Sequence, residues 1–458
     1  MLKLFNTLSR KVQEFKPIHP PKVGFYACGP TVYDRAHIGN HRAYIFDDIL
    51  HRALQHEAFD VQLVMNITDV GHLVSDADEG EDKLEKGAKR EKLSVWDVAE
   101  KYTKLFKADL KELNVIEPDQ WLKATDNIGE QIALIKKLED KALTYTTSDG
   151  VYYDTSKFPN YGKLARLNLE GQKEGARVEA NKEKRNPTDF ALWKFSPKGE
   201  QRQMEWESPW GKGFPGWHIE CSAMSMKALG ESFDLHTGGF DHIPVHHTNE
   251  IAQSEGATGK PFVKYWVHNE FLLVDGGKMA KSLGNAYTLD ELREKGFSPL
   301  AFRYYCLGAH YRSKLNFTWE GLQASQTALD DLLARVAAMA DTPKIGCAEF
   351  EQKFFEAVDN DLNTPQALAV VWGLLKSDYP DHAKKASLLK MDAVLGLGLA
   401  EAKAEVITIP KKVQALVDAR EAARKAKDWK QSDELRKEIE ASGFSVRDTD
   451  KGQIVGQK

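Results

Sequence analysis

The pattern of hydrophobic and polar positions predicts a β-α-β unit over residues 24–69. The unit begins with the apolar run GFYACG, continues through the turn-rich PTVYDRAHIGN and a helical stretch, and ends with a second apolar run, FDVQLVMNIT. Within the helical stretch, apolar side chains recur every three or four residues and therefore share one helix face. They are Ile45, Phe46, Ile49, Leu50, Ala53 and Leu54. A parallel sheet covered by helices is the architecture that this order favours.

Further along the chain, the pattern indicates an insertion and then a return to the sheet. We expect a compact insertion at about 115–205, where a helical pattern (IGEQIALIKKLEDKAL) leads into a short aromatic strand (GVYYDT). Two charged stretches, 75–95 and 172–187, are typical of solvated loops or of the edges of an insertion. The runs FDLHTGG and EFLLVDGGKMAKSLGN then resume the sheet.

Helical periodicity dominates the rest of the chain. Thr288 and Glu291 form a capping-box pair, and Thr364-Pro365 marks a further helix start. Beyond about residue 318 the sequence has no strand alternation, as in a helical half-bundle. The predicted domains are a Rossmann-like α/β domain at 1–315 with a functional loop at about 275–290, a helical bundle at 316–404 and a small unit at 405–458.

The composition is that of a multidomain globular protein. The chain has 458 residues, 63 Lys+Arg against 68 Asp+Glu, a net charge of −5, and 10% aromatic residues, which excludes a disordered chain. No window approaches the ~18 apolar residues of a membrane span, and the N-terminal segment has charges where a signal peptide is apolar. We therefore expect a cytoplasmic monomer without membrane contact, in which any nucleic-acid contact is local. The four cysteines are too few and too far apart for a disulfide framework.

A first candidate site is the tetrapeptide His37-Ile38-Gly39-Asn40, between a strand and a helix. Unpaired N–H groups at a helix start bind phosphate, glycine permits close approach of the backbone, and histidine can donate to a phosphate oxygen. A purely structural helix start is the alternative for such a tetrapeptide.

A second candidate site is Lys278-Met279-Ala280-Lys281-Ser282, which is bordered by glycines. Two lysines three residues apart on a loop can place ammonium groups on a phosphate whose negative charge increases in the transition state. The alternative is a solvated basic loop.

A third set consists of potential metal ligands. His246 and Glu250 are four apart in a helical segment and share one face, Cys28 ends the first strand, and Cys221 lies in GWHIECSAM. Two thiolates, an imidazole and a carboxylate suit Zn²⁺. Lone cysteines are also common as small buried hydrophobic residues.

Together the first two motifs resemble the HIGH and KMSKS signatures of class I aminoacyl-tRNA synthetases. The runs FYACGPTVYDRAHIGN, GWHIECSAM, HHTNEIAQSE and KMAKSLGN resemble cysteinyl-tRNA synthetases in particular, and the similarity extends over nearly the whole chain. This resemblance implies ATP-dependent activation of L-cysteine and transfer to tRNA(Cys), with one Zn²⁺ per chain and Mg²⁺ bound with ATP. Zinc would select the substrate thiol over the serine hydroxyl, so that no editing domain is needed.

The resemblance also implies roles for individual residues. The zinc ligands match Cys28, Cys221, His246 and Glu250, and the substrate cysteine would contact Thr68 and Trp217. Catalysis would depend on His37, Asn40, Lys278 and Lys281, with ATP also bound by Gly39, Gly238, Gly239 and Ser282. Other histidines near the metal would adjust the zinc or contact the adenylate, namely His218, His236, His242 and His247.

The sequence departs from the family pattern at four positions. Asn40 replaces the last histidine of HIGH, and Ala280 replaces the first serine of KMSKS. Thr237 stands where the family usually has glycine, and Thr248 replaces a common glutamate. None of these changes removes a proposed zinc ligand.

The last unit resembles the anticodon-binding unit of the family in ARKAKDWKQSDELR. The residues that match anticodon-contacting positions are Arg424, Trp429, Asp433 and Asp448. The chain ends in KGQIVGQK rather than in a basic tail with tryptophan, so the affinity for the anticodon is expected to be weaker or achieved differently. Two other functions remain open: a cysteine ligase acting on an amino sugar, as in mycothiol synthesis, and a non-catalytic zinc- and RNA-binding paralogue.

Overall fold

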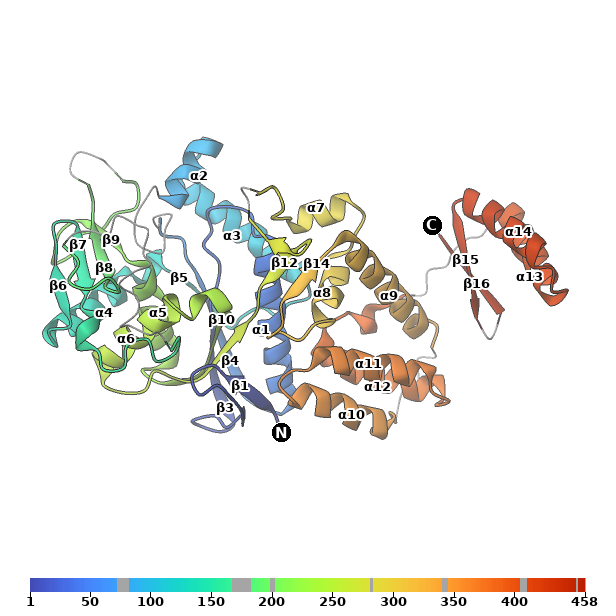
Figure 1. Ribbon diagram of the computed structural model, residues 1–458, viewed down its shortest axis with the longest axis horizontal. Helices are drawn as coiled ribbons and strands as arrows, with labels where there is room; N and C mark the ends of the chain where they lie inside the picture. Colours follow the sequence, from blue (N-terminus) through green and yellow to red (C-terminus); the bar gives the residue numbers. More distant parts are fainter. Residues whose placement is uncertain are drawn as a thin grey trace. The chain divides into compact units, whose positions relative to one another are not determined.

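Five parallel strands form the central sheet (Figure 1). Their order across the sheet is β11 (Val263–Asn269), β10 (Phe233–Gly239), β3 (Lys22–Ala27), β4 (Asp60–Ile67) and β5 (Gln120–Lys123). In this computed structural model, the described residues are 1–71, 82–166, 183–197, 202–280, 283–339, 345–403, 410–449 and 452–457. Helix α1 (Ile38–His56) connects β3 to β4, which confirms the predicted β-α-β unit.

Both faces of the sheet are covered, because successive side chains of a strand point to opposite sides. Phe25 packs with α1 and α3 (Val95–Glu112), whereas its neighbour Tyr26 packs with α5 (Trp217–Leu229) and α6 (His246–Thr258). The predicted doubly wound parallel sheet is therefore confirmed.

A second, antiparallel sheet lies beside α4 (Ile128–Asp140), α5 and α6 in Figure 1. It consists of β6 (Thr144–Thr146), β7 (Gly150–Tyr153), β8 (Phe190–Phe195) and β9 (Gly213–Pro215). These strands overlap the insertion predicted at 115–205, although β5 within that range belongs to the parallel sheet. The limits of the insertion stay a prediction.

Helix α2 (Lys83–Glu91) occupies part of the stretch 75–95, for which a loop was expected. That expectation was wrong for this part. The Asp82 carboxylate caps the helix by accepting the N–H groups of Leu84 and Glu85, and the fully buried Leu84 packs in the same core as α3. One cap and two buried apolar residues, Leu84 and Ala88, stabilise the helix, because a neighbouring helix supplies the packing surface. Residues 72–81 and 167–182 lie outside the described chain.

The remaining elements follow the predicted change to helices. After a small sheet of β12 (Leu272–Val274), β13 (Gly277–Lys278) and β14 (Leu315–Phe317), the helices are α7 (Leu289–Glu294), α8 (Pro299–Leu307), α9 (Trp319–Ala337), α10 (Ala348–Asp359), α11 (Thr364–Lys376) and α12 (Asp381–Leu395). The Thr288–Glu291 capping box at α7 is confirmed. A hairpin of β1 (Lys3–Asn6) and β2 (Lys11–Glu14) begins the chain. None of the described helices is long and apolar enough to cross a membrane.

The chain divides into two compact units, Met1–Glu401 and Ala402–Lys458. The second unit contains α13 (Lys411–Lys425), α14 (Trp429–Ala441) and the antiparallel hairpin β15 (Phe444–Thr449) and β16 (Gly452–Gln457). Its small core consists of Val413, Val417, Ile439, Phe444 and Val446. The expectation of helices alone beyond residue 318 was therefore wrong for this hairpin, in which Phe444 and Val446 pack against the two helices.

Candidate active site and metal centre

A cavity of about 770 Å³ lies where β3, β4 and β10 end. Ligands of open parallel sheets bind at the carboxyl ends of the strands, so this is the expected place for substrates. The structure brings most of the predicted site residues together around this cavity. They are Cys28, His37, Gly39, Asn40, Thr68, Trp217, Cys221, Gly238, Gly239, His246 and Lys278. Lys281 and Ser282 lie outside the described residues.

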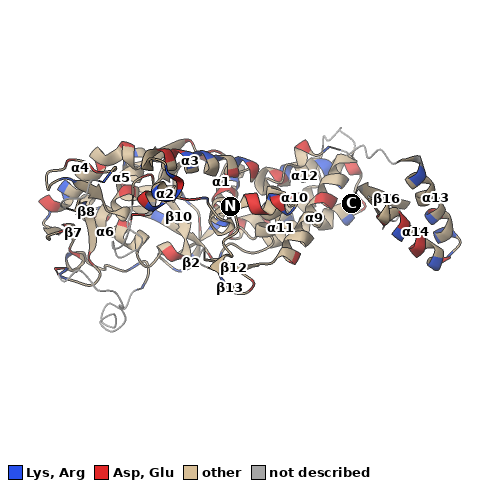
Figure 2. Ribbon diagram, turned by 90° about the horizontal axis from the view of Figure 1, so that it is seen from above, with Lys and Arg blue, Asp and Glu red and all other residues tan. Residues whose placement is uncertain are grey.

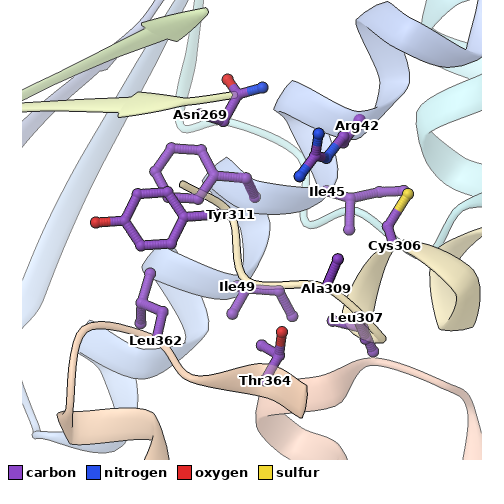
Figure 3. A pocket seen from close by; sticks show the side chains of 11 residues that line it. Arg42, Ile45, Ile49, Asn269, Cys306, Leu307, Ala309, Tyr311, Leu362 and Thr364 are labelled. Atoms are coloured by element: carbon purple, nitrogen blue, oxygen red, sulfur yellow. The ribbon is translucent and has the colours of Figure 1, made fainter. Parts of the chain in front are cut away.

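A second, much smaller cavity lies against α1, between residues such as Ile45, Cys306 and Tyr311 (Figure 3). Its volume is about 30 Å³. Water molecules need about 10–15 Å³ of such space each, so the cavity can hold one or two of them but no nucleotide or amino acid. The smaller cavity is therefore too small to be a second binding site for a substrate.

The HIGH-type motif forms the start of α1. His37 is the N-cap: its Nδ1 accepts the Asn40 N–H at 3.2 Å, and the Asn40 side-chain oxygen accepts the His37 N–H at 3.1 Å. Gly39 leaves little room for a side chain, because a Cβ would lie 3.0 Å from the His37 ring and 3.2 Å from the Met279 sulfur. The glycine thus lets the Lys278 loop approach the helix start.

The loop around Lys278 is held by the Asn285 side chain. Asn285 donates to the Lys278 carbonyl at 3.1 Å and accepts the Ala280 N–H at 2.8 Å. Farther along, the Tyr287 carbonyl accepts the Ile38 N–H at 2.8 Å, which links this segment to α1. Lys278 itself is exposed and borders the cavity, so its ammonium group can reach a phosphate there.

The four predicted metal ligands come together from three elements. Cys28 follows β3, Cys221 lies on α5, and His246 and Glu250 share one face of α6, one turn apart. One donor atom from each of them lies within 4.8 Å of the donor atoms of the other three. A second donor set, Cys28 with His236 and His247, shares Cys28 with the first.

Other histidines orient this cluster. His218 Nδ1 lies 2.9 Å from His246 Nδ1, so that the Nε2 atom of His246 points toward the cluster, 3.1 Å from Glu250. His236 Nε2 lies 2.8 Å from the other Glu250 oxygen. Partners of this kind fix the orientation of metal ligands. The sequence located these histidines in the neighbourhood but could not assign their contacts.

The protonation of the cluster favours a cation. A hydrogen bond from Cys28 lowers the pKa of Cys221 to about 7 despite burial, whereas burial and the adjacent Cys221 raise the pKa of Cys28. Burial lowers the pKa of His246, but the Glu250 charge and Cys221 outweigh it and raise this pKa to about 10. Near neutral pH, Cys28 and His246 therefore hold protons that a divalent cation would displace, whereas the Cys221 thiol is already partly ionised.

The donor set fits zinc on a further observation. Both Glu250 oxygens are fully buried, and neither has hydrogen-bond geometry with any described residue, although histidine nitrogens lie close to each. A buried carboxylate requires a compensating partner. Two sulfurs, one imidazole and one carboxylate are the ligands that zinc prefers, so these residues would hold it.

Thr68 and Trp217 lie beside the cluster. The Thr68 hydroxyl donates to Glu220 at 3.3 Å and accepts from Asn66 at 2.9 Å. The Trp217 ring lies 4.6 Å from that of His246. Both side chains line the cavity and can contact a small substrate bound at the cluster.

In the second unit, three of the four predicted anticodon residues, Arg424, Trp429 and Asp448, are linked to one another, and the fourth, Asp433, is exposed. Asp448 pairs with Arg424 at 2.9 Å and with the buried Arg420, which sequence analysis missed. The Arg424 guanidinium lies 5.7 Å from the centre of the half-exposed Trp429 ring, and Asp433 is exposed. Acidic and basic residues both occur along α13 and α14 (Figure 2), so charge alone does not mark an RNA site.

Comparison with known proteins identifies the family. Residues 14–327, more than half of the chain, match the family described as tRNA synthetases class I (C) catalytic domain. The chain is 52% identical over 453 residues to a cysteine–tRNA ligase 1 of Burkholderia lata, covering 99% of this chain and 96% of that protein. It belongs to the cysteine–tRNA ligase family. A family member from Treponema denticola is 46% identical over 480 residues, with 98% of each chain covered.

The later parts of the chain match this family as well. Residues 408–455 match the family described as Cysteinyl-tRNA ligase anticodon binding domain, and residues 353–377 match the DALR domain. The fold resembles that of a methionyl-tRNA synthetase from Mycobacterium tuberculosis in complex with methionyl-adenylate. The TM-score is 0.59 at 14% identity, and the match covers 83% of this chain and 93% of that chain. At this identity the likeness shows a shared fold and nothing more.

Proposed function

We propose that the chain is a cysteine–tRNA ligase. In the first step, the carboxylate of L-cysteine attacks the α-phosphate of ATP, giving cysteinyl-adenylate and releasing pyrophosphate. In the second step, a hydroxyl of the terminal ribose of tRNA(Cys) attacks the carbonyl carbon, and AMP leaves. The observation that carries this function is the placement of the Cys28–Cys221–His246–Glu250 cluster in the same cavity as His37 and Lys278.

The α1 start and the Lys278 loop are proposed to bind the triphosphate. The helix start offers a partial positive charge, whereas its Ile38 and Asn40 N–H groups already donate to Tyr287 and His37. Because the Asn40 side-chain oxygen is used by the helix cap, only its amide nitrogen is oriented to donate to a phosphate. Lys278 and Lys281 would stabilise charge as pyrophosphate leaves, with Mg²⁺ bound to ATP. Catalysis is then positioning and charge stabilisation, without a covalent enzyme intermediate.

Zinc, when bound by Cys28, Cys221, His246 and Glu250, would accept the substrate thiolate and select sulfur over the serine hydroxyl. The surrounding side chains would hold the other parts of the amino acid. Trp217 would cover the bound amino acid, and Thr68, which is held by Asn66 and Glu220, would hydrogen-bond to it. Gly238 is suited to the cavity wall because a Cβ there would lie 2.7 Å from His242 and His247.

The second unit is proposed to bind the anticodon of tRNA(Cys), by stacking on Trp429 or on the Arg424 plane and by hydrogen bonds to Asp433. The domain limits 1–315, 316–404 and 405–458 are proposed as first predicted. A cytoplasmic monomer stays a prediction from the sequence.

The test is cysteine-dependent exchange between ATP and labelled pyrophosphate, followed by charging of tRNA(Cys). We expect both reactions, with serine activated at least about a thousand-fold less efficiently than cysteine, beyond the roughly 10- to 200-fold that an apolar pocket alone achieves. Exchange without charging would favour the amino-sugar ligase. Absence of both reactions in zinc-loaded protein would favour a non-catalytic binder and contradict the proposal.

A further inference from the structure

A buried carboxylate that the proposed mechanism does not use lines the active cavity. Asp47, on the third turn of α1, is 3% exposed, and its Oδ1 atom has no hydrogen-bond partner among the described residues. A buried charge of this kind is costly unless a cation or a donor compensates it. The cavity is the side from which a ligand could supply that compensation.

Asp47 differs from the other acidic residues that line the cavity. Asp34 pairs with Arg90 at 3.2 Å, and the Glu270 carboxylate accepts the Phe271 N–H at 3.0 Å. Asp241 is exposed to water. Asp47 is therefore the lining carboxylate that gains most from a positively charged ligand.

The position of Asp47 relates it to the metal cluster through β10. Thr237 on β10 faces Asp47: its buried hydroxyl is close enough to lower the pKa of the Asp47 carboxyl, although the two groups do not have good hydrogen-bond geometry in the described chain. The Thr237 carbonyl accepts the N–H of Cys28, a proposed zinc ligand, at 3.3 Å. Thr237 therefore links Asp47 to the proposed metal site. The Asp47 charge contributes to raising the pKa of Cys28, as expected for near neighbours. Thr237 is also one of the positions at which the sequence departs from the family pattern.

We propose that the Asp47 carboxylate binds the α-ammonium group of the substrate cysteine, with the Thr237 hydroxyl as its neighbour in that subsite. The inference rests on the proposed function, because it requires the substrate sulfur at the metal cluster. Only two carbon atoms separate the sulfur from the nitrogen in cysteine. A substrate held by its sulfur beside Cys28 therefore presents its ammonium group within the same small region of the cavity.

The charges of the other ligands support this assignment. The phosphates of ATP and the carboxylate of cysteine are anionic and would be repelled by Asp47. The ammonium group is the cationic part of the substrates, and its charge-assisted hydrogen bond would compensate the buried carboxylate. Burial raises the pKa of Asp47 to about 7, opposed by Thr237 and assisted by Asp48, and a bound ammonium group would stabilise the ionised form.

The test compares cysteine with 3-mercaptopropionate, which keeps the thiol and the carboxylate but has no ammonium group. In the zinc-loaded full chain, Asp47→Asn should raise the KM for cysteine in pyrophosphate exchange about 10- to 100-fold, the range for losing a hydrogen bond between charged groups. The inhibition constant of 3-mercaptopropionate and the KM for ATP should change less than about two-fold.

Two further variants keep the test decisive. Asp47→Ala should reproduce the selective loss if Asp47→Asn fails to fold. Asp392→Asn changes a buried aspartate of α12 that is not among the residues lining the cavity, and it should leave the KM for cysteine unchanged. A parallel weakening of cysteine and 3-mercaptopropionate, or no weakening of either, would overturn the inference. A wild-type protein without exchange would overturn the proposed function, and the inference with it.

Discussion

The Asp448 carboxylate holds two arginines of the second unit, so Asp448→Asn tests how that unit is built and what it does. Arg420 donates to the two Asp448 oxygens at 2.8 and 3.0 Å, and Arg424 lies 2.9 Å from one of them. Arg420 is 1% exposed. Removing the counter-charge of a buried guanidinium costs about 3–5 kcal/mol.

Two features reduce this cost. The Gln453 side-chain oxygen still accepts from Arg420 at 2.7 Å, and Asp448 is itself 32% exposed, so that water screens part of the interaction. A loss of about 2–3 kcal/mol is the resulting expectation. A unit of this size, with a small apolar core, has a stability of only about 3–8 kcal/mol. Its melting temperature should therefore fall by about 10–20 °C.

The assay uses the full chain. Hydrogen exchange measured on peptides of α13 and α14 reports the local stability of the second unit, while pyrophosphate exchange reports the first. In Asp448→Asn we expect faster hydrogen exchange and at least about ten-fold weaker charging of tRNA(Cys), with pyrophosphate exchange within two-fold. Asp418→Asn, on the exposed face of α13, is the matched control and should change none of these.

Two outcomes would refute this reasoning. If charging falls while the amides of α13 and α14 stay protected, Asp448 acts on the RNA directly, as the family resemblance implies, and its pairing with Arg420 contributes little stability. If neither protection nor charging changes, the carboxylate has neither role.

Three further predictions concern the first unit. Lys278→Ala should slow cysteine-dependent pyrophosphate exchange about 10²–10³-fold with tRNA binding unchanged, and a loss under ten-fold would contradict its role. Cys221→Ser should lower zinc content, measured by mass spectrometry, below about one per chain and raise the KM for cysteine far more than that for ATP. Equal losses would indicate a damaged fold. Arg303→Leu removes a buried partner of Asp48 and should destabilise by about 3–5 kcal/mol in urea, against under about 0.5 kcal/mol for the exposed Arg335→Leu; equal effects would count against the buried pair.

Much of the fold could be predicted because local signals and tertiary packing agree. The β3-α1-β4 unit follows from two apolar runs around one amphipathic helix, and the Thr288–Glu291 cap marks the start of α7. Helix α2 was missed because its stability comes from packing against α3 and from the Asp82 cap, and neither is visible in a charged stretch with few large apolar residues. Interaction with a neighbouring element outweighed the local composition.

The site was predictable only in part. The spacing of His246 and Glu250 places both on one helix face, whereas the meeting of Cys28 with Cys221 depends on the order of strands in the sheet. The partners of Glu250 and Arg420 could not be predicted either, because they lie far apart in the sequence and have no motif. The zinc ligands were identified from the resemblance to a family, whereas Asp47 was identified only from the lining of the cavity.

The structure also explains how the HIGH-type motif can end in asparagine. Because His37 Nδ1 accepts the Asn40 N–H, the neutral imidazole carries its proton on Nε2, the nitrogen that would donate to a phosphate. The Asn40 side-chain oxygen accepts the His37 N–H, which completes the capping box at the helix start. The backbone N–H of residue 40 thus fixes the tautomer of His37, and the Asn40 side-chain oxygen helps to hold the position of His37 without contributing a charge. The positive charge on the phosphates must then come from the helix start and from the Lys278 loop, which makes the activity of this chain especially dependent on those lysines.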